Sequence, residues 1–81
     1  MLGNFVLHIA NHRGKVLKTV EANSAAMLKL YAMNNTTGKK TSIVMNEDTK
    51  EIVMLVLGNG DGWPRAITNK DEIEAMGICI E

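Results

Sequence analysis

Ile52-Val53-Met54-Leu55-Val56-Leu57 is a run of six apolar residues, followed at once by the glycine-rich segment Gly58-Asn59-Gly60-Asp61-Gly62 and then by Trp63-Pro64. A strand with one wet face alternates apolar and polar residues, whereas a run without a polar position is typical of a strand covered on both faces. The stretch therefore predicts a central strand over 51–57 that ends in a tight loop with left-handed residues. The rest of the chain has to supply a layer for each face of that strand.

The residues before this strand predict two hairpins and a long helix. Alternating apolar residues around a turn at Gly14 predict strands near 4–10 and 15–21, and the lysines of the second favour an edge position. A third strand over 41–45 pairs with 51–57. Between the hairpins, Asn23 or Ser24 caps a helix over 25–33. Three of its residues have the spacing of a core stripe: Met27, Leu30 and Tyr31.

The residues after the glycine loop predict three short elements. Residues 65–67 are expected to be extended, Thr68 or Asn69 to cap a short helix through Met76, and 78–81 to form a last strand. The predicted order is ββαββαβ. The fold class is α+β: a single domain over 1–81, with a mainly antiparallel sheet of four or five strands and the long helix packed on one face.

Composition indicates a small cytoplasmic protein. The chain has 81 residues, 46% of them hydrophobic, which suits one folded domain with one core. The single cysteine cannot form an internal disulfide, so the reducing cytoplasm is the expected location. The first residues lack a basic segment and their apolar run is short, so neither a signal peptide nor a membrane-spanning helix is expected.

Charge divides along the sequence although the formal net charge is zero. Residues 1–45 carry six basic residues and one acid, a net charge of +5, and residues 46–81 carry three basic residues and eight acids, a net charge of −5. Whether this division becomes two separate regions in space depends on the order of the strands.

No motif in the sequence predicts catalysis, a metal or a cofactor. The glycines at 58–62 lack the spacing of a dinucleotide fingerprint, and no phosphate-loop lysine follows them. His8 and His12 fall on a strand and in a turn, without a third ligand nearby, so we expect His8 to be half-buried and His12 solvated. Cys79 has no neighbouring base that would favour its thiolate. We therefore expect a protein that is not an enzyme and that needs no cofactor.

Two segments, Ala25–Met33 and Ile52–Leu57, look too apolar for so short a chain to cover alone. We therefore predict an interaction or regulatory protein that binds a macromolecule, first of all a protein, and that self-associates as a homodimer. Small size without catalytic residues is also common among accessory or inhibitor proteins of phages and other mobile elements, which is an association only. The predicted partner-binding residues surround the glycine loop: Trp63, Asp61, Asn59 and Arg65.

Two alternatives remain open at this stage. The first is a small nucleic-acid-binding protein that uses the basic residues of the first half, Arg13, Lys15, Lys18, Lys39 and Lys40. It requires the loop before the third strand to lie near the first turn. The second is a small-ligand or nucleotide pocket near Gly58–Trp63, at the seam of a dimer. No membrane partner is expected.

Overall fold

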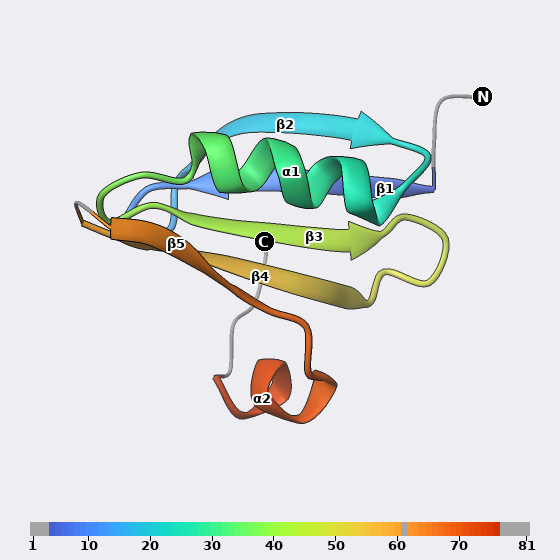
Figure 1. The fold of residues 1–81 in the computed structure, drawn as a ribbon. Helices are drawn as coiled ribbons and strands as arrows, with labels where there is room; N and C mark the ends of the chain where they lie inside the picture. Colours follow the sequence, from blue (N-terminus) through green and yellow to red (C-terminus); the bar gives the residue numbers. More distant parts are fainter. Residues whose placement is uncertain (1–3, 61, 77–81) are drawn as a thin grey trace.

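The structure, a computed structural model, describes residues 4–60 and 62–76. Its five strands form one antiparallel sheet in the order β2-β1-β3-β4-β5 (Figure 1). The elements along the chain are β1 (Phe5–Ala10), β2 (Val16–Ala22), α1 (Ala25–Asn35), β3 (Thr41–Asn46), β4 (Ile52–Asn59), β5 (Gly62–Ile67) and α2 (Lys70–Ala75). The predicted α+β class with a mainly antiparallel sheet of four or five strands is confirmed, and the sheet has five strands, with β2 at an edge as expected.

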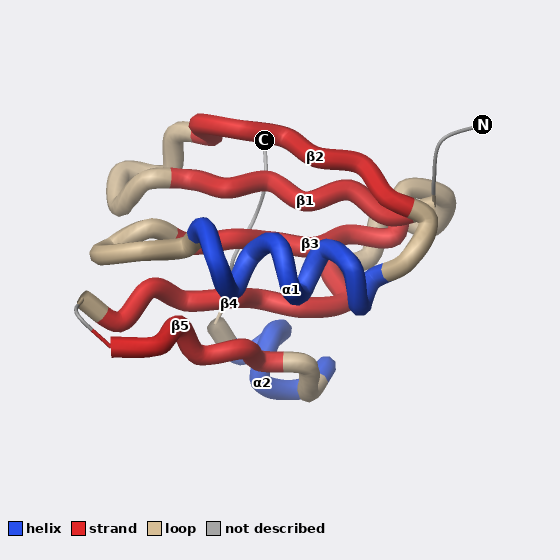
Figure 2. Tube along the Cα trace, turned by 45° about the horizontal axis from the view of Figure 1, so that its top comes forward, coloured by secondary structure: helices blue, strands red, loops and turns tan. Residues whose placement is uncertain are grey.

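The two helices lie on opposite faces of the sheet (Figures 1 and 2). On one face, Met54 and Val56 of β4 pack with Leu28 and Ala32 of α1. On the other face, Leu55 packs in a second cluster that includes Ile73 of α2. The prediction that this strand is covered on both faces is therefore confirmed. The chain covers it with its own helices, so the expectation that this strand requires a partner is wrong.

The α1 helix is rotated differently from the prediction. Its fully buried residues are Leu28 and Ala32, while Met27 and Leu30 point outward with 61% and 67% of their surface exposed. The helix is apolar from Ala25 to Met33 except at Lys29, so spacing alone does not select the buried stripe. Leu28 and Ala32 are one helical turn apart and share a face, and the small Ala32 lets the helix backbone approach the sheet closely. The outward face of α1 is thus left apolar.

The glycine-rich segment is mostly strand, which corrects the predicted loop. β4 continues through Gly58 and Asn59, and β5 begins at Gly62. The Gly58 amide donates a hydrogen bond to the Lys40 carbonyl at 2.9 Å, and the Gly60 amide donates to the Gly38 carbonyl at 3.2 Å. These bonds to the loop before β3 extend the pairing beyond the apolar run. Within the described part of the turn, Gly60 has a positive φ of 57°, as the loop prediction expected.

The predicted short piece at 65–67 is a full strand of six residues, β5. Pro64 is tolerated inside it because β5 is an edge strand, where a missing amide hydrogen removes no ladder bond on the outer side. The order of the described elements is therefore ββαβββα rather than ββαββαβ. The predicted last strand at 78–81 lies outside the described residues. The short helix begins where predicted, and the Asn69 side-chain oxygen caps it by accepting hydrogen bonds from the amides of Asp71 and Glu72.

A buried pair of hydroxyl groups joins the end of α1 to β3. Thr36 and Ser42 are both fully buried, and their side-chain oxygens are hydrogen-bonded to each other. Replacing Ser42 by alanine is expected to lower the free energy of unfolding by about 1–3 kcal/mol, because the Thr36 hydroxyl then stays buried without this partner. Urea denaturation measures the loss. The double variant T36V/S42A removes both hydroxyl groups, so its free energy of unfolding should fall by less than that of S42A. A loss in the double variant equal to or greater than that of S42A would contradict this account.

Candidate functional site

The four predicted partner-binding residues do not share one surface. Trp63 is 77% exposed and lies on the side of the sheet that α1 covers. Arg65 pairs with Leu57, which belongs to the second cluster, so Arg65 lies on the opposite face. Asn59 is exposed at the end of β4, and Asp61 is outside the described residues. Of this set, Trp63 lines a cavity.

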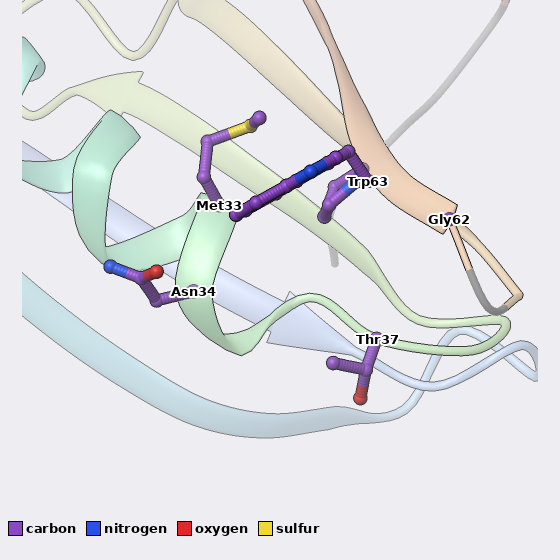
Figure 3. Close-up of a pocket in the computed structure, with 6 residues that line it drawn as sticks. Met33, Asn34, Thr37, Gly62 and Trp63 are labelled. Carbon is purple, nitrogen blue, oxygen red and sulfur yellow. The ribbon is translucent and has the colours of Figure 1, made fainter.

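That cavity is an open pocket of about 370 Å³ between the end of α1 and the start of β5. Its apolar lining residues are Met33, Trp63 and Pro64, and its polar lining residues are Asn34 and Thr37. In Figure 3 the indole ring of Trp63 lies beside the Met33 side chain, with Asn34 and Thr37 on the far side of the helix end. The described residues make no side-chain hydrogen bond to Asn34 or Thr37. We call this cavity the Trp63 pocket.

The predicted basic residues are mostly gathered at one end of the sheet. Ala10 pairs with Thr41, so the β1–β2 turn lies beside the loop that leads into β3. The expectation that this loop lies near the first turn is thus met (Figures 1 and 2). We call the four residues carried by these two connections the basic end: Arg13, Lys15, Lys39 and Lys40. Lys18, the fifth predicted residue, lies instead over the Tyr31 ring of α1, with its Nζ 5.3 Å from the ring centroid.

Acidic residues collect at the opposite end of the sheet. The β3–β4 turn carries Glu47, Asp48 and Glu51, and α2 lies next to it, because Lys70 Nζ is 3.7 Å from a carboxylate oxygen of Glu51. We call this region the acidic end: Glu47, Asp48 and Glu51 with the α2 residues Asp71, Glu72 and Glu74. Both ion pairs between described residues, Lys50–Glu47 and Lys70–Glu51, lie there. The charge division of the sequence therefore becomes a division in space.

The histidines lie as the sequence suggested. His8 is half-buried, and its Nδ1 lies 3.2 Å from the Thr19 hydroxyl oxygen, while His12 is exposed in the first turn. Among the described residues, no three His, Cys, Asp or Glu side chains are grouped so that they could hold a metal ion. No helix in the described part of the chain is long and apolar enough to cross a membrane.

The sequence did not indicate the residues that complete the Trp63 pocket and the exposed side of α1. The sequence predicts Met27 and Leu30 in a core stripe and Met33 only as the end of the apolar segment, and it does not predict Asn34 or Thr37 as site residues. The signal for the first pair was the absence of a polar face on the helix, which indicated an uncovered side without showing which one. The pocket residues gave no signal, because residues 33–37 and 62–64 are brought together only by the fold.

Comparisons with protein-family models, with curated proteins and with solved structures find no match for this chain. Function is therefore inferred from the surfaces themselves.

Proposed function

We propose that this chain is a small, non-enzymatic interaction protein whose outer α1 face binds protein. The protein proposed to bind there is a second copy of the same chain. We define the outer α1 face as Ala26, Met27 and Leu30. The observation that carries the proposal is the exposure of Met27 and Leu30, nearly two thirds of each side chain, side by side on one helix. Large apolar side chains grouped on a surface usually mark an interface.

The charge distribution supports a second copy as the occupant. The α1 helix runs from the acidic end of the sheet to the basic end (Figure 1). A two-fold axis that pairs two α1 helices antiparallel sets the basic end of each copy beside the acidic end of the other. Such a pairing is self-complementary, as a symmetric dimer requires. A parallel pairing would place like charges together.

The expected affinity is modest. Burying a Met or Leu side chain completely contributes roughly 1.5–3 kcal/mol, and association costs several kcal/mol in lost freedom of motion. Two such residues from each copy, with screened charges at the rim, support a dissociation constant on the order of micromolar to tens of micromolar. The ionic contribution falls as salt is added.

Replacing Leu30 by glutamate is expected to abolish self-association. Sedimentation equilibrium between about 1 and 200 μM should show wild-type mass rising from 8.9 kDa toward twice that value, with weaker association at 500 mM than at 50 mM NaCl. The L30E variant should stay at the mass of one chain. Its folding should be nearly unchanged, because Leu30 is largely exposed.

The matched control is Leu17→Glu, which places the same charge on an exposed leucine of β2, away from the outer α1 face. We expect L17E to associate as the wild type does. A wild-type chain that remains monomeric at 200 μM, or an L17E effect equal to that of L30E, would refute the second copy as occupant.

A further inference from the structure

The basic end and the Trp63 pocket are connected by the short loop between α1 and β3. Thr37 lines the pocket, and Lys39 and Lys40 follow it within three residues. The loop is tied to the β4–β5 turn by the hydrogen bonds from Gly58 to Lys40 and from Gly60 to Gly38. The exposed ring of Trp63 thereby lies at the same end of the sheet as basic residues from the other half of the sequence.

The field at this end is positive. Residues 11–15, 36–41 and 58–62 together contain four basic residues and one acid, Asp61, for a net formal charge of +3. Residues 46–51 and 68–76, at the other end, have a net formal charge of −4. No described salt bridge involves Arg13, Lys15, Lys39 or Lys40. These side chains are therefore available to a phosphate backbone.

The pocket has the chemistry to hold a nucleobase. Trp63 offers an exposed π-face, and stacking of a base on such a ring is tolerant of sequence. Asn34 and Thr37 also line the pocket, but in Figure 3 their polar groups point away from the Trp63 ring, so the stacking contact carries the proposed binding of the base. The volume of about 370 Å³ is at the low end of the range for ligand pockets, which suits one base rather than a whole dinucleotide.

We propose that this end of the sheet binds single-stranded nucleic acid, with one base stacked on Trp63 in the pocket and the neighbouring phosphates on the basic end. A duplex keeps its bases stacked in the helix, so the pocket selects for single strands. The residues that carry this inference differ from those of the outer α1 face, although Met33 and Asn34 of the pocket lie one helical turn from Leu30. The inference does not rest on the proposed self-association.

Trp63 is the only tryptophan of the chain, so its fluorescence reports directly on the pocket. Titration with a single-stranded 12-mer of mixed sequence at 50 mM NaCl is expected to quench that fluorescence with saturation. Heparin, a polyanion without bases, should cause little quenching, and a duplex of the same sequence should bind more weakly than the single strand. Equal binding of the duplex, equal quenching by heparin, or no saturable quenching up to 100 μM would overturn the proposal.

Two variants separate the stacking contact from the phosphate contacts, with binding measured by anisotropy of a labelled oligonucleotide. Trp63→Ala should weaken binding roughly tenfold or more with little change in the salt dependence. The K39A/K40A variant should weaken binding and reduce the slope of log affinity against log salt by about 1.4, since each phosphate contact on a single strand contributes about 0.7. The K50A/K70A control removes two lysines from the acidic end and should leave the slope unchanged. Unaltered affinity in both W63A and K39A/K40A, each shown to be folded by circular dichroism, would refute the site. L30E, which is expected to stay a single chain with its basic end uncovered, should bind the oligonucleotide at least as tightly as the wild type does.

Discussion

Replacing Leu55 by alanine is expected to lower the free energy of unfolding by about 2–5 kcal/mol, the range for a buried leucine whose removal leaves a cavity. Leu55 is fully buried in β4, among Ile43, Ile67 and Ile73 on the side that α2 covers. A domain of this size has a total stability on the order of 5–15 kcal/mol, so the loss is a large fraction of the whole. Urea denaturation followed by circular dichroism measures it.

The control for this prediction is Leu17→Ala on the edge strand β2, where the leucine is 51% exposed. Its loss should stay below about 1 kcal/mol, because little buried surface is removed. If the two alanine variants were equally stable, the small layer formed by α2 would not be a packed core, and the second face of β4 would be open to a partner after all.

Replacing Gly58 by alanine is expected to destabilise the fold by about 3 kcal/mol, the upper part of the range for overpacking. A Cβ atom at this position would lie 2.5 Å from the Gly38 carbonyl oxygen and 2.9 Å from that of Lys40. Both atoms belong to the backbone, and the Lys40 oxygen accepts the hydrogen bond from Gly58 itself, so neither can move without separating the loop from the strand. Thermal denaturation should show the loss.

Gly62→Ala is the matched control for Gly58→Ala. Its nearest atom would be the Asn59 side-chain nitrogen at 3.1 Å, which can rotate away, so a loss below about 1 kcal/mol is expected. A Gly58→Ala protein as stable as Gly62→Ala would show that the loop and the strand are not held together as described. In that case Gly58→Ala should also leave the Trp63 pocket intact.

Much of the fold could be predicted because its pattern is local. The hairpin around Gly14 and the run Ile52–Leu57 are marked by periodicity two and by uninterrupted apolar character, which the structure turns into β1, β2 and β4. The strand ends at 58–62 could not be predicted, because glycines indicate a loop unless a second backbone lies close enough to require them. That backbone is the Gly38–Lys40 segment, about twenty residues earlier in the sequence.

The candidate surfaces could be predicted less well, for two physical reasons. From Ala25 to Met33 the α1 helix is apolar at every position except Lys29, so its rotation is set by the fit of Ala32 and Leu28 against the sheet rather than by its own pattern. Trp63 and the basic residues belong to oppositely charged halves of the sequence, and the pairing of Gly38 with Gly60 brings them to one end. The charge division itself could be read from the sequence, but its spatial form required the strand order.

The strand order also has a consequence for how the chain assembles. Three of the four described strand pairs join neighbours in sequence, whereas β1 and β3 are joined across α1, with Ala10 opposite Thr41 and Phe5 opposite Asn46. The β1–β2 hairpin and the β3–β4–β5 meander can therefore each form by short-range closure. Their docking closes a far longer loop, and we expect the entropy of that closure to make this seam the slow step of folding. The molecule is thus two locally assembled units, and the α1 helix that carries the proposed interface is the tether that connects them.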